Sequence, residues 1–137
     1  MRVVFDTDVT LDLLFDRKPH SANAALLFSK AERGEIEGYL CATTVTTLHY
    51  LASKVIGENK ARISLRKLLS FLNIAAVDRK VIEGALAGRG RDFEDEVISR
   101  SAARAGAQAI ITRNIKDFKT SDVPAYSPEE FIKAMKI

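Results

Sequence analysis

The sequence predicts a single-domain α/β protein over residues 1–137, a three-layer α/β/α sandwich with a mostly parallel sheet of four to five strands. Short apolar segments alternate along the chain with longer segments whose apolar residues recur at helical spacing, as in parallel strands joined by crossover helices. The chain has 137 residues, of which 47% are hydrophobic and 28% are charged. This composition suits one compact domain and argues against a disordered or low-complexity chain.

The first part of the chain contains two strand-like segments, each followed by helical spacing. Residues 3–5 are apolar and favour a β-strand, and the apolar residues of 9–15 are spaced as in a short helix. A second helix is predicted from Ser21 to Gly34, because glycine readily ends a helix in the left-handed conformation. Residues 37–42 form the next predicted strand.

The middle of the chain contains two predicted helices and the third strand. The first helix covers 44–56 and ends at glycine, and the second covers 60–71. Residues 74–77 form a short strand, and Asp78 follows it as the cap of another helix. We expect five residues in or just after the 60–71 helix to face the core: Ile63, Leu65, Leu68, Leu69 and Leu72.

The last part of the chain contains the fourth strand and two further helices. A helix is predicted from Asp92 to Gly106, followed by a strand at 109–111 and an edge strand at 123–126. Ser127 then begins the final helix. The sequence Ser-Pro-Glu-Glu provides a capping serine, a proline in the first turn and a glutamate whose side chain can bond the backbone N–H of the serine.

Composition limits the classes of function. The single cysteine, Cys41, excludes an internal disulfide and a cysteine-rich zinc module. No apolar run reaches the ~18 residues of a membrane helix, and the N-terminal segment meets an acid too early for a signal peptide. We therefore expect a cytoplasmic protein with no membrane partner. The net charge of +3 permits a polyanionic partner.

Acidic side chains are predicted to meet at one edge of the sheet. Asp6 follows the first strand and Asp117 lies beyond the fourth, while Asp92 and Asp95, with Glu96 on the same face, begin a helix that runs antiparallel to the strands. The four carboxylates expected to converge are Asp6, Asp92, Asp95 and Asp117. Clustered carboxylates remain ionised together only with a cation among them, and hard oxygen ligands favour Mg²⁺ or Mn²⁺. The sequence therefore predicts a metal site suited to phosphodiester chemistry.

Three segments together resemble the PIN-domain family: residues 3–9 (VVFDTDV), 92–95 (DFED) and 111–118 (ITRNIKDF). The resemblance spans nearly the whole chain and implies the PIN fold. It also implies a metal-dependent ribonuclease of the kind found as VapC-type toxins, whose partner is an antitoxin. Family members tend to form homodimers, and the first two helices with the 60–71 helix offer an apolar surface for such a contact.

The resemblance also implies roles for individual residues. Asp6, Asp95 and Asp117 match catalytic metal-binding acids, and Asp92 matches a further acid of the branch with this Asp-Phe-Glu-Asp sequence. These acids would hold Mg²⁺ or Mn²⁺. Second-shell residues that orient the ligands would be Thr112, Asn114 and Thr47. The basic residues expected to contact RNA phosphates are Arg17, Lys18, Arg89, Arg91 and Arg113.

Two departures from the family pattern lower the expected negative charge. Thr47 stands where members usually have a glutamate, and Asn114 stands where many have an aspartate. Each change should weaken metal binding, while Asp92 adds one carboxylate. The alternative is a catalytically weakened PIN-like module that binds RNA or protein.

A second alternative is a haloacid-dehalogenase-type phosphatase. The segment around Asp6 is similar to the opening motif of that family, in which Asp6 would be the nucleophile and Asp8 the general acid/base. That family also needs a lysine before an acidic pair at a strand end. The fourth strand instead leads into Thr-Arg-Asn.

Overall fold

The computed structural model describes residues 1–88 and 92–136. Five strands form one sheet in the order β3-β2-β1-β4-β5, and every neighbouring pair is parallel. The strands are β1 (Arg2–Phe5), β2 (Glu37–Cys41), β3 (Asn73–Ala75), β4 (Ala109–Ile111) and β5 (Ala125–Tyr126). The predicted α/β class with a parallel sheet is therefore confirmed.

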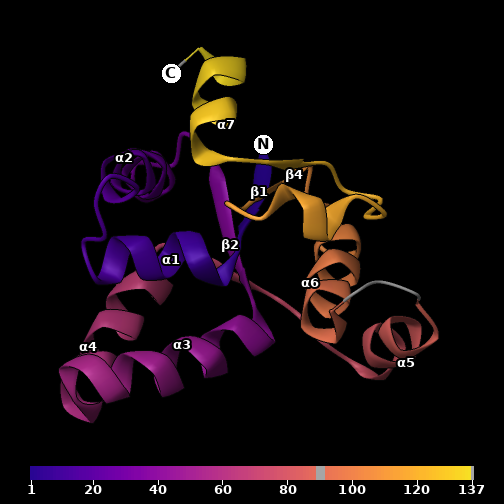
Figure 1. Ribbon diagram of the computed structural model, residues 1–137, viewed down its shortest axis with the longest axis horizontal. Helices are drawn as coiled ribbons and strands as arrows, with labels where there is room; N and C mark the ends of the chain where they lie inside the picture. Colours follow the sequence, from indigo (N-terminus) through magenta and orange to yellow (C-terminus); the bar gives the residue numbers. More distant parts are fainter. Residues whose placement is uncertain (89–91, 137) are drawn as a thin grey trace.

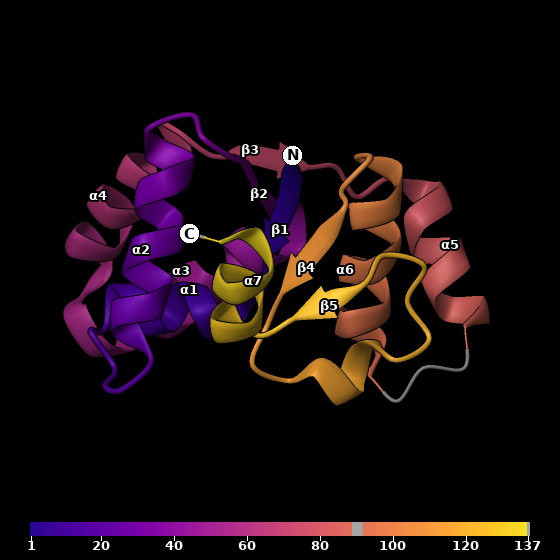
Figure 2. The ribbon, with the colours of Figure 1, turned by 90° about the horizontal axis from the view of Figure 1, so that it is seen from above.

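Helices cover both faces of the sheet. In the described residues they are α1 (Thr7–Leu14), α2 (Ser21–Glu32), α3 (Ala42–Ile56), α4 (Glu58–Leu69), α5 (Arg79–Ala87), α6 (Phe93–Arg104), α7 (Pro128–Met135) and the 3₁₀ helix η1 (Ile115–Phe118). Helices α1 to α4 lie on one side of the sheet, and α5 and α6 lie on the other (Figures 1 and 2). This is the predicted three-layer arrangement.

The central strand shows how the two layers are built. Val3 and Phe5 of β1 pack into the core beneath α1 to α4 and α7, whereas Val4 packs into the core beneath α5 and α6. Successive side chains of a strand point to opposite faces, so a strand between two helical layers needs apolar residues at every position. All three side chains are fully buried.

Most helix boundaries agree with the sequence. Gly34 and Gly106 have φ of +76° and +74° just beyond α2 and α6, the left-handed conformation that ends a helix. The Asp78 carboxylate accepts a hydrogen bond from the Val81 N–H and caps α5. Ser127 forms the predicted capping box at the start of α7.

Some local predictions differ from the structure. The third and last strands are shorter than the predicted 74–77 and 123–126, and η1 was not predicted. Ile63 does not face the core, because its side chain is 65% exposed. The buried face of α4 passes through Ala61, Leu65 and Leu68. Ile63, two residues from both Ala61 and Leu65, projects from roughly the opposite side of the helix.

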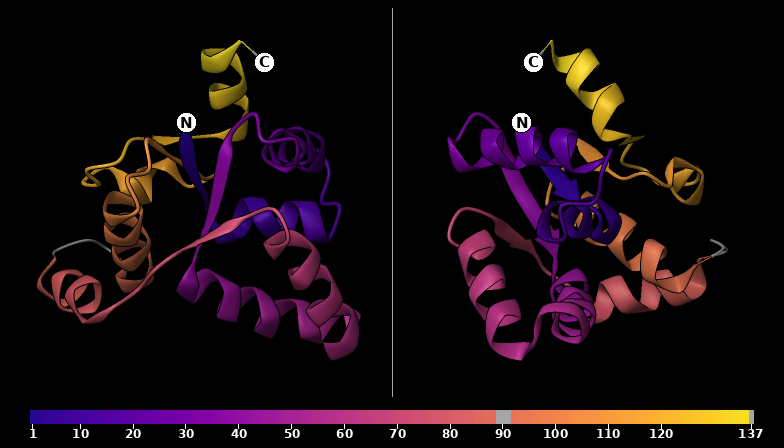
Figure 3. Two further views of the ribbon diagram at one scale, coloured as in Figure 1. Left: turned by 180° about the vertical axis from the view of Figure 1, so that it is seen from behind. Right: turned by 60° about the vertical axis from the view of Figure 1, so that its left-hand side comes forward.

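The parallel topology fixes where polar residues meet. Strands β1 and β2 end at the same edge of the sheet, where the chain turns into α1 and α3 (Figures 1 and 3). Helix α6 runs back toward the start of β4, so its first turn lies near this edge. Within the part of the chain that the structure describes, no helix has the length and apolarity needed to cross a membrane.

Candidate functional site

A pocket lies at the carboxyl edge of the sheet, and acids dominate its lining. They come from the β1–α1 junction, from the first turn of α6 and its cap, and from η1. We call this the acidic pocket; its carboxylates are Asp6, Asp8, Asp92, Glu94, Asp95 and Asp117. The pocket thus brings together all four acids named from the sequence. Their role as metal ligands stays a prediction.

Asp6 is the most deeply placed of these acids, with only 6% of its surface exposed. One carboxylate oxygen accepts a hydrogen bond from the Thr7 N–H at 2.8 Å and caps α1. The other accepts a hydrogen bond from the Thr112 hydroxyl at 2.8 Å. Burial, followed by the nearby Asp8 charge, raises the pKa of Asp6 to about 6.

Asp95 lies in the first turn of α6 and is half-buried. Burial raises its pKa to about 7, with further contributions from the negative charges of Asp6, Asp92 and Asp117. Its backbone N–H donates to the Asp92 carboxylate at 3.1 Å, so Asp92 also caps the helix. The acids are close enough that ionisation of one opposes ionisation of the others.

These residues suit a divalent cation in their chemistry. In the described part of the chain, no three His, Cys, Asp or Glu side chains are arranged so that they could hold a metal ion together as they stand. The acids of the pocket nevertheless provide oxygen donors, and a cation among them would relieve the repulsion that, after burial, contributes to the raised pKa values of Asp6 and Asp95. The oxygen-rich set of residues therefore fits Mg²⁺ or Mn²⁺ in its chemistry.

The residues expected to orient these acids occupy the loop after β4 and the face of α3. The Thr112 hydroxyl, which donates to Asp6, accepts a hydrogen bond from the Asn114 N–H at 3.0 Å. The Asn114 side-chain amide lies 3.4 Å from the Asp8 carboxylate. The Thr47 hydroxyl lies 3.2 Å from a carboxylate oxygen of Glu94. Thr112 contacts a predicted ligand directly, whereas Asn114 and Thr47 contact neighbouring acids.

The five predicted RNA-contacting residues differ in their placement. Arg17 and Arg113 line the acidic pocket. Lys18 is exposed and is not among the residues that line it. Arg89 and Arg91 lie outside the described residues.

Sequence reasoning missed three acids of this region. Glu94 lines the pocket with Asp92 and Asp95, whereas Glu96 pairs with Arg100 at 3.5 Å. Asp8 has a structural role that the sequence did not indicate, and its carboxylate accepts a hydrogen bond from the Arg113 N–H at 3.0 Å.

The third missed acid is Asp12, which is fully buried and pairs with Arg17 and Arg113. Its signal in the sequence was an acid among the leucines of a short amphipathic helix. A buried carboxylate there requires a partner of opposite charge.

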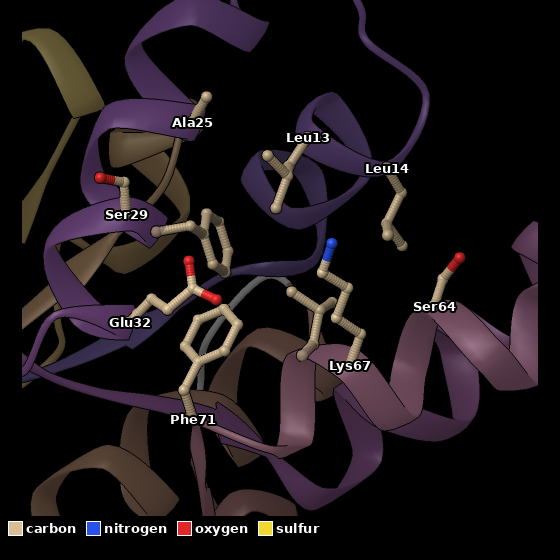
Figure 4. Close-up of a pocket in the computed structure, with 10 residues that line it drawn as sticks. Leu13, Leu14, Ala25, Ser29, Glu32, Ser64, Lys67 and Phe71 are labelled. Atoms are coloured by element: carbon tan, nitrogen blue, oxygen red, sulfur yellow. The ribbon is translucent and has the colours of Figure 1, made fainter.

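A second hollow has a different character. It is an apolar groove between α1, α2 and α4, into which side chains from all three helices point (Figure 4). Its lining residues are Leu13, Leu14, Ala25, Phe28, Ser29, Glu32, Ser64, Lys67, Leu68 and Phe71. It lies on the surface where the sequence suggested an apolar contact with a second copy.

A comparison with family models matches residues 2–116 to the model described as "PIN domain". No curated protein matches the chain.

Solved structures provide matches to the fold. VapBC2 from Rickettsia felis, bound to a promoter DNA fragment, is 19% identical with a TM-score of 0.68, and the match covers 93% of this chain and 98% of that one. A toxin–antitoxin complex from Klebsiella pneumoniae is 23% identical with a TM-score of 0.69, covering 92% and 97%. The VapC20 toxin of Mycobacterium tuberculosis is 16% identical with a TM-score of 0.63, covering 79% and 86%.

Proposed function

The chain belongs to the PIN-domain family, and from this premise we propose that it is a divalent-metal-dependent endoribonuclease that hydrolyses RNA phosphodiester bonds. The observation that carries the proposal is the acidic pocket, where six carboxylates from three separate segments face a common space bordered by two arginines. A site of this kind attracts a divalent ion and, through that ion, the phosphate groups of a nucleic acid.

The acidic residues of the pocket would bind the metal ion. Asp6, Asp92, Asp95 and Asp117 would hold the ion, which when bound supplies a Lewis acid and lowers the pKa of a coordinated water. Asp6 is kept in place by hydrogen bonds to Thr7 and Thr112. The carboxylates must be ionised to bind the ion, so the raised pKa values of Asp6 and Asp95 make binding weaker in acid.

The basic residues complement the acids. Arg17 and Arg113 stand at the border of the pocket, where their guanidinium groups can offer N–H donors to the phosphates on either side of the scissile bond. The exposed Lys18 adds positive charge on the same loop as Arg17. Guanidinium groups suit this role because they bind phosphate in a bidentate manner.

We propose RNA as the substrate and an antitoxin as the partner. The Klebsiella pneumoniae structure is described as a toxin–antitoxin complex, and the Mycobacterium tuberculosis protein as a toxin that cleaves the sarcin–ricin loop. These descriptions support the same function here, while the low sequence identity leaves the particular RNA and the particular antitoxin open. Homodimer formation stays a prediction from the family.

The weakened, non-catalytic module is the second candidate function. It is favoured by Thr47, which occupies the position where the family usually has a glutamate. The structure offers a counter-argument, because Glu94 lies beside Thr47 and brings a carboxylate into the acidic pocket. The pocket therefore keeps a negative charge near the position of the missing glutamate.

The phosphatase alternative is not retained. Family membership argues against it, and so does the environment of Asp8. The oxygens of Asp8 already accept hydrogen bonds from the backbone N–H groups of Val9 and Arg113, the latter at 3.0 Å. Asp8 therefore serves to join α1 to the loop after β4.

Cleavage of a mixed single-stranded RNA pool, with Mg²⁺, with Mn²⁺ and in EDTA, tests the proposal. We expect metal-dependent cleavage that falls at least about 100-fold in Asp6→Asn and in Asp95→Asn, because even outer-shell groups of metal sites contribute ~10–100-fold. Asp122→Asn is the matched control, since Asp122 is exposed and lies away from the acidic pocket. RNA binding without metal-dependent cleavage would favour the non-catalytic module, and cleavage unchanged in both variants would contradict the site.

A further inference from the structure

Asp12 is a buried acid to which the mechanism above assigns no role. Only 1% of its side chain is exposed, although it lies on α1 between two leucines. Both of its carboxylate oxygens are used by guanidinium groups from outside α1. The two arginines concerned, Arg17 and Arg113, are the two that line the acidic pocket.

Arg17 reaches Asp12 because the chain reverses at the end of α1. Asp16 has φ of +49°, a left-handed conformation, and the Arg17 N–H donates to the Asp12 carbonyl oxygen at 3.0 Å. The Arg17 side chain then turns back along α1. Its Nε donates to the Asp12 carboxylate at 2.8 Å, and its Nη2 donates to the Asp8 carbonyl oxygen at 3.1 Å.

Arg113 reaches the same carboxylate from a distant part of the chain. It follows β4 and Thr112, and its Nε and Nη2 donate to the two oxygens of Asp12 at 2.7 and 3.2 Å. Its backbone N–H is held by Asp8 at 3.0 Å. Both the side chain and the backbone of Arg113 are therefore fixed to α1, while 33% of the side chain remains exposed.

This arrangement keeps the two guanidinium groups out of ion pairs with Asp6 and Asp95, the two acids of the pocket whose pKa values are raised to about 6 and about 7. Arginines free to move beside Asp6 and Asp95 would pair with them and compete with a metal ion. Among the described residues, neither guanidinium forms an ion pair with Asp6 or Asp95. Arg17 and Arg113 use only some of their guanidinium N–H groups on Asp12 and on the Asp8 carbonyl oxygen, and the remaining N–H groups can bind phosphate.

We propose that Asp12 is a positioning residue that holds Arg17 and Arg113 as a fixed pair of phosphate-binding groups beside the acidic pocket. The proposal rests on the proposed ribonuclease function and deepens it, because it names what binds the RNA backbone. Asp12 itself would contact neither RNA nor metal. Its effect on RNA binding would pass entirely through the two arginines.

The test compares the parent with Asp12→Asn, which preserves shape and removes the charge. We expect KM for RNA to rise about tenfold, the size of effect of an outer-shell positioning group, with kcat changed less than about twofold. Anisotropy of a labelled single-stranded RNA in EDTA should give the same loss of affinity. The matched control is Arg62→Lys, because Arg62 is an exposed arginine paired with Glu58 on α4.

Adding Asp12→Asn to a variant that lacks both arginines separates an effect on positioning from an effect on folding. In a background carrying Arg17→Gln and Arg113→Gln, adding Asp12→Asn should leave RNA affinity unchanged, once concentrations are corrected for folded protein. If Asp12→Asn does not fold, Arg17→Lys and Arg113→Lys replace it, since lysine keeps the charge and loses the planar fork. We expect each lysine variant to raise KM severalfold.

The outcomes distinguish the two proposals. RNA affinity of Asp12→Asn equal to that of the parent, or lysine variants that bind as tightly as the arginines, would overturn the role of Asp12 and leave the ribonuclease intact. A parent that binds RNA through this pair and cleaves nothing would overturn only the ribonuclease. A parent that neither binds nor cleaves RNA would overturn both.

Discussion

Asp6 and Asp12 are both buried aspartates, one just before α1 and one on it, but their surroundings are opposite. Asp6 faces other acids, and its pKa is raised to about 6 by burial and by Asp8. Asp12 faces two guanidinium groups at 2.7 and 2.8 Å. The fold thus neutralises one carboxylate with its own cations and leaves the other among acids, with hydrogen bonds from Thr7 and Thr112 as its partners.

The difference teaches how a site can remain available to a metal. In a protein with arginines at the border of an acidic pocket, the acids keep their negative charge available only if the arginines do not form ion pairs with them. Here the buried Asp12 holds the guanidinium groups, and hydrogen bonding to Asp12 raises the pKa of Arg113. The same acid therefore stabilises the fold and preserves the negative charge of the neighbouring pocket.

The largest expected effect is on the free energy of unfolding, which should fall when Asp12 is replaced and rise when Asp6 is replaced. Asp12→Asn should lower the free energy of unfolding by about 3 kcal/mol, because it leaves two partly buried guanidinium groups without their carboxylate. Asp6→Asn should raise it by about 1 kcal/mol in metal-free protein at pH 8, because an unfavourable buried charge is removed. Urea unfolding in EDTA measures both. Two changes of the same sign would contradict the comparison.

The next prediction concerns how Tm depends on pH, because Asp6 and Asp95 of the pocket have raised pKa values. The folded-state pKa values of Asp6 and Asp95, about 6 and about 7, lie above the ordinary value of 3.8. Raised carboxyl pKa values favour the folded state below pH ~4, and this contribution is lost as pH rises to about 7. Metal-free protein should therefore show a falling Tm between pH 5 and pH 8.

Added Mn²⁺ should raise Tm more at pH 8 than at pH 5, because the ion binds the ionised carboxylates. Asp95→Asn should flatten both profiles. A Tm of the metal-free parent that rises steadily from pH 5 to pH 8, with no larger effect of Mn²⁺ at high pH, would count against a pocket of mutually repelling acids.

The smallest expected effect concerns the acid beside Thr47. Glu94→Gln should weaken Mn²⁺ binding severalfold, since Glu94 lies in the acidic pocket and its charge contributes to the raised pKa of Asp6. Isothermal titration with Mn²⁺ measures this change, and Glu83→Gln on the exposed face of α5 serves as the control. Equal Mn²⁺ affinities for Glu94→Gln and the parent would contradict this prediction. They would mean that the Glu94 carboxylate does not replace the glutamate that family members usually have at the position of Thr47.

Much of the fold could be predicted from local pattern. The apolar run of β1, the glycines after α2 and α6, and the caps Asp78 and Ser127 all act within a few residues, so the sequence reveals them directly. Ile63 was placed wrongly because its residue type outweighed its spacing: it lies two residues from Leu65 and therefore off the buried face of α4. Short edge strands such as β5 form because they pair with a neighbouring strand, so their signal in the local sequence is weak.

The sequence by itself determined that Asp6, Asp92, Asp95 and Asp117 gather, because the carboxyl ends of parallel strands and the start of an antiparallel helix must lie at one edge. Only the tertiary structure decided the charge balance around each acid. Asp12 meets Arg113 across a separation of 101 residues, and Thr47 meets Glu94 across 47. The charge environment of an acid depends on its distance in space from other charged groups, and contacts between residues this far apart in the chain are set only when the helices and strands pack together.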